Sequence, residues 1–201
     1  IPNTTPQQRD NFTSEPGDTF IICLDPGHGG TDVGAQDPTE TRNEKDDNLA
    51  LALAVSKALE GSSDKIKVIM TRNDDSALTL MERCDFANEQ GASVFVSLHR
   101  NTGGGTGVEV WIHSEATKAD KKLGNAVMGS LEATEISRSR GLRNGTPSNP
   151  NADFVVIRET AMPACLIELG FMDSETDNTL FDAHMEDYAK AIADGILSLV
   201  D

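Results

Sequence analysis

Short apolar runs alternate with amphipathic segments along the chain from Thr19 onward. Apolar runs that stop at turn residues are typical of buried strands, and they predict strands at residues 20–24, 66–70, 93–98, 154–157 and 165–167. Apolar side chains alternate with Glu109, Trp111 and His113 over residues 108–112 and just beyond. This alternation predicts a further strand with one covered face and one more polar face.

Apolar residues that recur every three or four positions predict helices at residues 47–60, 80–91, 117–134 and 185–200. Asp47 or Asn48 can cap the first of these helices. Thr79 and Glu82 match a capping box, in which each side chain satisfies a free backbone N–H. The polar residues 137–153 are predicted to form a long loop. This order of elements indicates an α/β fold of three layers, with a mostly parallel sheet of about six strands flanked by helices.

The composition fits one globular domain. The chain has 201 residues, 37% of them apolar and 25% charged, which is enough for one core and too few for two comfortable ones. Residues 1–18 hold three prolines and mostly polar side chains, so we predict a polar tail or linker there and a folded domain over residues 19–201. No apolar run approaches the ~18 residues needed to cross a bilayer, so we expect no membrane insertion.

The charge balance excludes several kinds of partner. Lys and Arg total 17 against 33 Asp and Glu, which gives a formal net charge of −16. Such a surface repels phosphate backbones, so we expect no nucleic-acid partner. The same repulsion applies to anionic wall polymers, so targeting to a cell wall would need a separate module that this chain lacks. The three cysteines form no CxxC pair, and Cys23 and Cys165 are expected to pack as small hydrophobic residues.

Candidate acid, base and metal-binding side chains follow three of the predicted strands. His28 lies in the turn after the first strand, and His99 and Glu168 each end a later one. The carboxyl ends of parallel strands meet at one edge of a sheet, where functional side chains gather. A histidine beside a turn is on its own more often structural. His113 and His184 have no such placement and are interpreted as ordinary surface or helix residues.

Four segments resemble, in order, the motifs of zinc-dependent N-acetylmuramoyl-L-alanine amidases of the Amidase_3 family. They are residues 25–30 (DPGHGG), 44–49 (EKDDNL), 96–101 (VSLHRN) and 168–171 (ELGF). Further similarity lies at residues 70–72, 107–110 and 142–143, and the resemblance covers residues 19–200. Such enzymes cut the amide bond between the lactyl group of N-acetylmuramic acid and the first L-alanine of the peptidoglycan stem peptide. The resemblance thus implies a zinc amidase catalytic domain over residues 19–201.

The resemblance also implies roles for individual side chains. His28, Glu44 and His99 would hold a Zn²⁺ ion, and Glu168 would be the catalytic carboxylate. Two imidazoles and a carboxylate are a common catalytic zinc set, whose open fourth position takes a water. Zinc lowers the pKa of that water from about 15.7 to about 7, and Glu168 would shuttle its proton to the departing nitrogen. From the residues alone, Glu44 could equally be a helix-entry acid that interacts with the helix dipole and with Lys45.

Candidate substrate-binding residues are Asn101, Arg140 and Arg143. The two arginines lie in the predicted loop and reach anionic groups of the substrate in one interpretation, and are simply solvated in the other. Arg100 stands where the family often has a small residue. We expect it to pair with a surface acid, the alternative being a stem-peptide carboxylate.

The segment between the strand that ends in His99 and the next strand is short. Residues 102–107 cannot hold the long inhibitory helix that some relatives of the family carry there, so we expect an open cleft.

The resulting hypothesis is a secreted or cell-wall-associated zinc amidase that acts on peptidoglycan muropeptides, either as a bacterial autolysin or as a phage lysin. Two alternatives stay open. The first is a zinc peptidase that cuts within the stem peptide with the same ligands. The second is a catalytically inert wall-binding module, against which an intact Glu168 argues.

Overall fold

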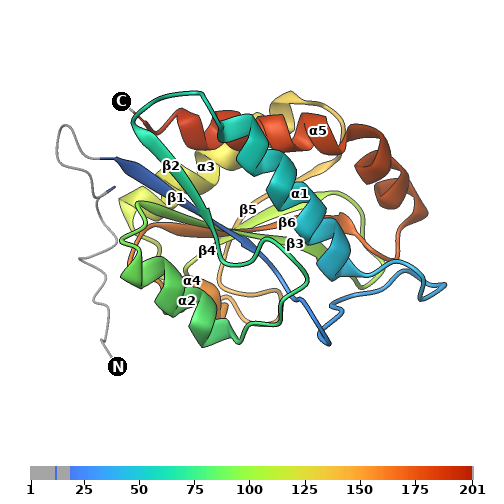
Figure 1. The fold of residues 1–201 in the computed structure, drawn as a ribbon. Helices are drawn as coiled ribbons and strands as arrows, with labels where there is room; N and C mark the ends of the chain where they lie inside the picture. The colour runs from blue at the N-terminus through green and yellow to red at the C-terminus, as the bar shows by residue number, and fades with distance from the viewer. Residues whose placement is uncertain (1–11, 13–18, 201) are drawn as a thin grey trace.

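The computed structural model describes Phe12 and residues 19–200 of the chain. Strands and helices alternate from Phe20 to Leu197. In chain order (Figure 1) they are β1 (Phe20–Pro26), α1 (Glu44–Leu59), β2 (Ile66–Met70), α2 (Leu80–Glu89), β3 (Val94–Asn101), β4 (Val108–Ile112), α3 (Lys118–Ala133), β5 (Ser139–Asn144), α4 (Val155–Arg158), β6 (Ala164–Phe171) and α5 (Glu175–Leu197). The predicted tail at residues 1–18 lies outside the described residues except for Phe12. The ring of Phe12 packs against Phe20, with 6.4 Å between the ring centroids.

One sheet of six strands runs through the described residues in the order β2-β1-β3-β6-β4-β5. Strands β2, β1, β3 and β6 are parallel, whereas β4 runs antiparallel to β6 and β5 runs parallel to β4. The mostly parallel sheet predicted from the sequence is confirmed. The carboxyl ends of β1, β3 and β6 meet at one edge of the sheet, together with the beginnings of β4 and β5.

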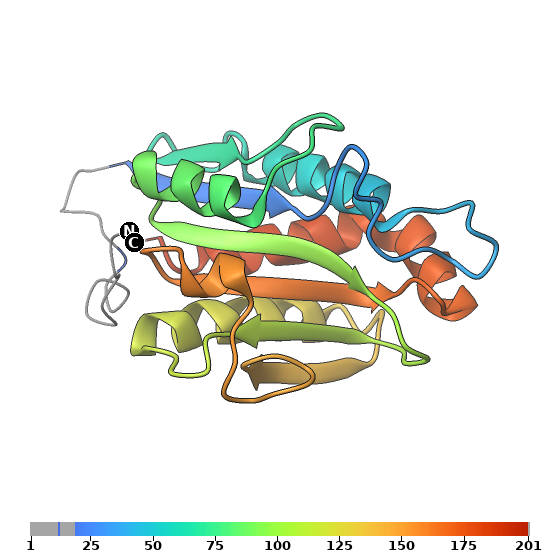
Figure 2. The ribbon, with the colours of Figure 1, turned by 90° about the horizontal axis from the view of Figure 1, so that it is seen from below.

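Helices cover the two faces of the sheet unequally. The long helices α1, α3 and α5 lie on one face, and α2 and the single-turn α4 lie on the other (Figure 2). Because side chains alternate along a strand, neighbouring residues such as Ile22 and Cys23, or Val96 and Phe95, enter two different cores. In Figure 2 no helix lies in front of β4 and β5. Long side chains and the segment after β5 are left to cover that part of the sheet.

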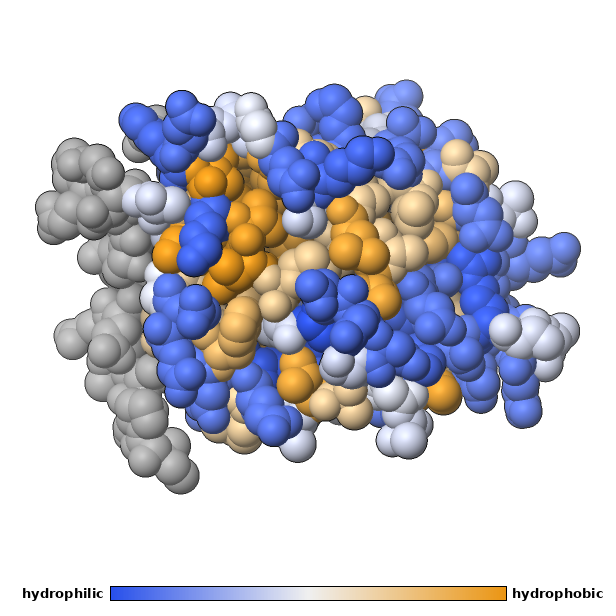
Figure 3. Space-filling view, viewed as in Figure 1, coloured by the Kyte–Doolittle hydropathy of each residue, from blue (hydrophilic) through white to orange (hydrophobic). Residues whose placement is uncertain are grey.

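The sheet edge at β2 is only partly covered. Ile66, Val68 and Ile69 are half-buried and Lys67 is exposed, and a patch of apolar surface lies over this strand in Figure 3. A short edge strand that carries a lysine is a poor template for pairing with another chain. Deeper in the structure, all three cysteines are free and buried, as the apolar runs around Cys23 and Cys165 predict.

Two predicted elements were wrong. Residues 154–157, predicted as a strand, belong mostly to helix α4, which buries Val156 and Ile157 against α2 and β6. The position beside β6 is already occupied by β3 on one side and β4 on the other. The supposed loop at residues 137–153 contains the edge strand β5. This strand has one large apolar residue, Leu142, so pairing with β4 rather than its own pattern makes it a strand.

Helix boundaries also differ from the prediction, while the capping box of α2 and the extent of α3 are confirmed. Helix α1 begins at Glu44, because Asn43 rather than Asp47 takes the extended N-cap conformation. Helix α5 begins after Ser174, whose hydroxyl accepts a hydrogen bond from the first turn. Its regular geometry breaks at His184 (φ −130°, ψ 18°), so the predicted start at residue 185 coincides with the second half of a kinked helix.

The expected polar face of β4 is buried. All five residues of the strand are buried. The charge of Glu109 is compensated there by Arg140, and its carboxylate accepts a hydrogen bond of 2.9 Å from Trp111 Nε1. Arg143 and Phe154 lie against the Trp111 ring, at 5.6 Å and 6.1 Å from its centroid. Side chains from β5 and from the segment after it therefore cover this part of the sheet in place of a helix.

A buried carboxylate closes the end of β1. Asp25 is fully buried, and it accepts hydrogen bonds from Thr71 (2.6 Å), Ser97 (2.7 Å) and Arg83 Nη1 (2.8 Å). The Arg83 side chain is itself only 3% exposed. Breaking such a pair leaves a charge in the interior without its partner, which is expensive.

We therefore predict that Arg83→Met lowers the free energy of unfolding by about 3–5 kcal/mol. Lys190→Met is the control, because the Lys190–Asp194 pair is 70% and 52% exposed and its loss should change stability by less than about 0.5 kcal/mol. Denaturant titration followed by circular dichroism measures both. Equal losses in the two variants would show that the buried pair has no special weight.

Candidate metal centre

Two buried arginines fix the backbone of the turn after β1. Arg72 donates to the carbonyl oxygens of Pro26 and Gly27 (both 2.9 Å), and Arg83 donates to those of Pro26 and His28 (both 2.7 Å). His28 has φ 62°, in the left-handed region that residues other than glycine seldom occupy. The surrounding donors hold this conformation, and it sets the direction in which the imidazole leaves the chain.

Glu44, the first residue of α1, is a buried carboxylate with several donors. Its Oε2 accepts a hydrogen bond of 2.8 Å from the amide of Ala35, and its Oε1 accepts one of 3.0 Å from the amide of Arg100. The side-chain amide of Asn48, one helical turn later, donates to Oε1 at 3.2 Å. These contacts leave the carboxylate one orientation, which points toward the carboxyl edge of the sheet.

Two imidazoles meet this carboxylate. His28 Nε2 lies 3.2 Å from Glu44 Oε2, and His99 Nδ1 lies 2.8 Å from Glu44 Oε1. The ring centroids of the two histidines are 5.0 Å apart, and one ligand atom from each of the three residues lies within 4.8 Å of the others. A tetrahedral ion with bonds of about 2.05 Å separates its ligand atoms by about 3.3 Å. The cluster fits a divalent ion of the zinc type, in donor chemistry and in size.

The pKa shifts within the metal-free cluster also indicate a site for a cation. Burial opposes a charge on His28, but hydrogen bonds with Glu44 and Asp32 outweigh it and raise the pKa of His28 to about 9. Burial also opposes the charge on Glu44, yet His28 and His99 hold its pKa well below the usual range. The pKa of His99 is raised by Glu44 against the effect of burial. Protons thus take the place that a cation would fill between these groups.

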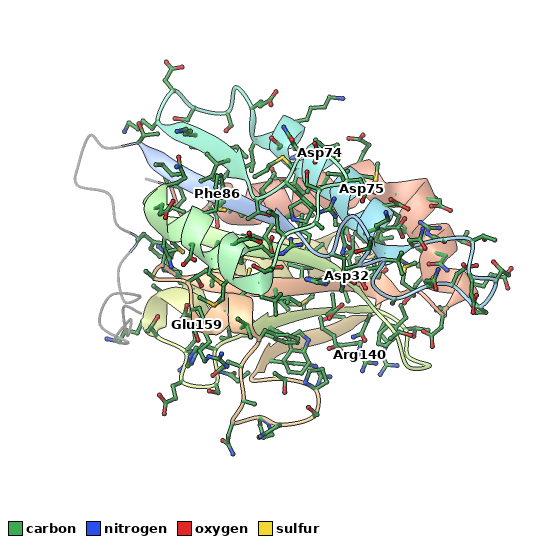
Figure 4. The ribbon with its side chains drawn as sticks, turned by 60° about the horizontal axis from the view of Figure 1, so that its bottom comes forward. Asp32, Asp74, Asp75, Phe86, Arg140 and Glu159 are labelled. Atoms are coloured by element: carbon green, nitrogen blue, oxygen red, sulfur yellow. The ribbon has the colours of Figure 1, made fainter. Side chains whose placement is uncertain are left out.

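Asp32 orients the first imidazole from behind. Its Oδ2 lies 2.8 Å from His28 Nδ1, so Nδ1 carries the hydrogen and Nε2 faces Glu44 and His99. The carboxylate is 67% exposed and lies beside the turn after β1, near the centre of Figure 4. Its hydrogen bond with His28 lowers the pKa of Asp32, although burial acts in the opposite direction.

Glu168 lies next to the cluster in the sheet. It pairs with His99 across β3 and β6 and with Glu109 across β4 and β6, so all three side chains leave the same face. Glu168 Oε2 is buried and has no hydrogen-bond partner among the described residues. Burial raises the pKa of Glu168 to about 7, with His99 acting in the opposite direction and Glu44 and Glu109 adding to the rise. A carboxyl group that titrates near neutral pH can both accept and donate a proton.

Known proteins share this chain's sequence and fold. Residues 22–198 match the family model described as N-acetylmuramoyl-L-alanine amidase. The chain belongs to this family. It is 34% identical over 177 residues to the N-acetylmuramoyl-L-alanine amidase CwlM of Bacillus licheniformis, covering 87% of this chain and 66% of that protein. It is also 34% identical over 156 residues to a sporulation-specific N-acetylmuramoyl-L-alanine amidase of Bacillus subtilis, covering 78% of this chain and 58% of that protein.

A solved structure agrees with the family assignment. The crystal structure of an N-acetylmuramoyl-L-alanine amidase from Clostridium difficile 630 matches with a TM-score of 0.84 at 34% identity, over 92% of this chain and 98% of that one. The chain spans 66% and 58% of the length of the two Bacillus relatives. Among the described helices of this amidase-family chain, none is long and apolar enough to cross a membrane.

The three candidate substrate-binding residues have different surroundings. Asn101 ends β3 and turns its side chain back to accept a hydrogen bond of 2.8 Å from the amide of Thr102. Arg140 and Arg143 belong to the edge strand β5 rather than to a loop. Arg140 pairs with Glu109, and Arg143 Nε lies 3.8 Å from the same carboxylate. Neither arginine is simply solvated.

Arg100 is a correction to the sequence analysis. Its side chain is fully buried rather than paired with a surface acid, and it makes an ion pair with Asp47. Its Nη2 donates to Asn178 (2.7 Å), and its guanidinium lies 4.5 Å from the centroid of the Phe181 ring. Arg100 therefore joins α1, β3 and α5, and its backbone amide holds Glu44 while its side chain points away from the cluster.

The two remaining histidines lie away from the cluster, as expected. His113 follows β4 at the opposite edge of the sheet, with Nε2 3.3 Å from Asp153, and His184 lies at the kink of α5. A cavity of about 220 Å³ opens beside the cluster, between His28 and His99 on one side and mainly α2 and α4 on the other. Its apolar lining residues are Leu78, Leu80 and Val156.

Sequence reasoning missed the residues that support the cluster, namely Asp32, Arg72, Arg83 and Glu109. Asp32 lies four residues after His28, and this spacing does not predict a contact when a glycine turn separates the two residues. Two signals were available: Arg72 and Glu109 lie in segments that resemble the family, at residues 70–72 and 107–110, and Glu109 is a charged residue within an apolar run, which needs a partner.

Close packing around His99 generates a metal-binding prediction. A Cβ atom at Gly27 would lie 2.1 Å from the His99 ring, whereas one at Gly129 of α3 meets nothing within 4 Å. We expect Gly27→Ala to displace the imidazole and to weaken Zn²⁺ binding by about tenfold or more, in the range seen when ligand-orienting contacts are lost. Gly129→Ala is the matched control. Competition with a fluorescent chelator measures both affinities, and an unchanged affinity in Gly27→Ala contradicts the assignment of His99 to the centre.

The raised pKa of Glu168 generates a pH prediction for the metal-free protein. An acid whose pKa is about 7 when folded and 4.5 when unfolded stabilises the fold below pH 4.5, and this contribution is lost as the pH rises through 7. Glu168→Gln lacks this dependence. The stability of Glu168→Gln relative to the unaltered chain should therefore rise between pH 4.5 and 7. Urea titrations in a chelating buffer measure the difference, and a pH-independent difference would refute the shift.

Proposed function

We propose that this chain hydrolyses the amide bond between N-acetylmuramic acid and L-alanine in bacterial peptidoglycan. One observation carries the proposal: the cross-strand neighbour of the His28, Glu44 and His99 cluster is Glu168, whose Oε2 is buried and has no hydrogen-bond partner among the described residues. Family membership supports the same reaction. Metal-binding side chains beside an acid that titrates near neutral pH are what hydrolysis of an unreactive amide requires.

We propose Zn²⁺ as the metal, held by His28 Nε2, the Glu44 carboxylate and His99. When bound, zinc supplies an activated water and polarises the scissile carbonyl. Asp32 keeps His28 in the tautomer that presents Nε2, and the amides of Ala35 and Arg100 hold Glu44 in place. Because these supports are in place before any ligand arrives, little reorganisation accompanies binding.

Glu168 acts on protons in this proposal. Its carboxylate accepts a proton from the attacking water and then delivers a proton to the nitrogen of the departing L-alanine. Burial supports both steps, since a pKa of about 7 lets the group hold either charge state at neutral pH. The neighbouring carboxylates are engaged elsewhere: Glu44 contacts both histidines and Glu109 pairs with Arg140. Asp25 pairs with Arg83, and Asp32 is bound to His28 Nδ1.

Substrate binding is proposed for Asn101, Arg140 and Arg143. The two arginines lie on β5, in the part of the sheet that no helix covers, and Asn101 ends β3. We propose that the enzyme is secreted or wall-associated, because its substrate lies there. A net charge of −16 opposes attachment to anionic wall polymers, so a separate module would provide targeting.

We predict that Glu168→Gln lowers turnover by about 100-fold or more, in line with the usual contribution of a general acid–base group, and leaves one bound zinc per chain. His28→Ala should instead lose the metal. Mass spectrometry of products from defined muropeptides and metal analysis of the purified variants give the two readouts.

The products also separate the competing functions. A released peptide with L-alanine at its amino terminus supports the amidase. Cleavage further along the stem supports a zinc peptidase, and zinc-independent binding without any cleavage supports an inert wall-binding module. Full turnover by Glu168→Gln would reject the role of Glu168 while leaving the metal centre intact.

A further inference from the structure

We propose that Arg140 binds the free α-carboxylate of the second stem-peptide residue, a glutamate linked onward through its γ-carboxyl group. The inference rests on the proposed amidase function and adds a specificity to it: the enzyme prefers stem peptides in which this carboxylate is not amidated.

The guanidinium of Arg140 is held on its face and on one edge. Its central carbon lies 5.1 Å from the centroid of the Phe171 ring, and its Nε donates to Glu109. Phe171 is fixed in turn by the glycine-rich segment, because a Cβ atom at Gly105 would lie 2.4 Å from the ring. A planar group held in this way presents its remaining edge, the two Nη atoms. These atoms donate no hydrogen bond to the described residues, and the side chain is 27% exposed.

The local charge balance favours an anionic ligand. Glu109 Oε1 pairs with Arg140, while its Oε2 accepts a hydrogen bond from Trp111 and lies 3.8 Å from Arg143 Nε. Two guanidinium groups thus face one internal carboxylate, which leaves one positive charge without a partner. Arg143 lies over the Trp111 ring and is 41% exposed, so it can compensate Glu109 when Arg140 engages a second carboxylate. The whole chain has a net charge of −16, so this excess of positive charge is confined to the surroundings of Glu109.

Distances select the second residue. Glu109 on β4 is the cross-strand neighbour of Glu168, and Arg140 reaches Glu109 from β5 on the far side of β4, so its guanidinium lies between one and two strand spacings, about 5–10 Å, from the proposed catalytic carboxylate. An extended peptide advances by about 3.5 Å per residue. From the scissile carbonyl, L-alanine occupies the first step, and the α-carboxylate of the next residue branches off about 7 Å away. The third residue is displaced further still, because the glutamate continues through its longer side chain.

The test compares two synthetic disaccharide-peptides that differ only in the second residue, free isoglutamate or isoglutamine. The zinc-loaded enzyme should show a kcat/KM at least about tenfold higher for the free carboxylate, the discrimination typical of one charge-assisted hydrogen-bonded pair. Arg140→Gln should reduce this ratio to near one, mainly through KM for the free carboxylate. Arg138→Gln, which removes an exposed arginine just before β5, should keep the ratio.

Arg140→Lys covers the case in which Arg140→Gln fails to fold, because lysine keeps a cation beside Glu109 and lacks the planar fork. A reduced ratio in this variant supports the assignment. Equal cleavage of both substrates by the unaltered enzyme overturns the subsite and leaves the amidase function standing. No cleavage of either substrate overturns the proposed function instead. A preference that survives in both Arg140 variants, or that follows amidation of the third residue, overturns the role of Arg140.

Discussion

The carboxylate of Glu44 lies between two imidazoles in a buried setting, and much of the surrounding structure keeps it there. A buried charge is tolerated only when hydrogen bonds and opposite charges surround it. The amides of Ala35 and Arg100 provide the first, and His28 and His99 provide the second. These partners come from a loop, from β3 and from the turn after β1, so the site assembles only when the sheet and α1 have docked. Arg100 serves both needs, because its amide holds Glu44 while its side chain joins α1 and α5 to β3.

The unequal covering of the sheet decides where substrate can approach. On one face, α1, α3 and α5 cover most of the sheet and leave the edge strand β2 half-buried. On the other face, α2 and α4 cover only part of the sheet, and no helix lies in front of β4 and β5 (Figure 2). The His28, Glu44 and His99 cluster borders a cavity on the side of α2 and α4. Residues 102–107, which join β3 to β4, contain no helix. We therefore propose that side chains at β4 and β5 determine the substrate specificity.

The sequence was most informative where a pattern is local. The alternating elements, the capping box of α2 and the strand ends that carry His28, His99 and Glu168 follow from spacing alone. β5 could not be predicted, because its residues carry almost no apolar signal and its pairing with β4 is a long-range contact. Residues 154–157 were misread since their β-branched composition favours a strand, while the sheet positions beside β6 were already taken. The burial of Arg100 depends on Asp47, Asn178 and Phe181, which only the folded chain brings together.

Two neighbouring carboxylates on β4 and β6 are treated in opposite ways, and the contrast explains why the arginines lie where they do. Glu109 receives Arg140, Arg143 and the Trp111 N–H, whereas Glu168 Oε2 receives no hydrogen bond from the described residues. If Arg140 paired with Glu168 instead, its charge would lower the pKa of that carboxyl group and remove its capacity to hold a proton near neutral pH. Glu109, which lies one strand away from Glu168, binds the guanidinium groups instead. The guanidinium groups therefore lie beside Glu109, while Glu168, the proposed proton-transferring group, has no arginine partner among the described residues. Neighbouring carboxylates in different environments allow one fold to separate the proposed substrate binding from the proposed proton transfer.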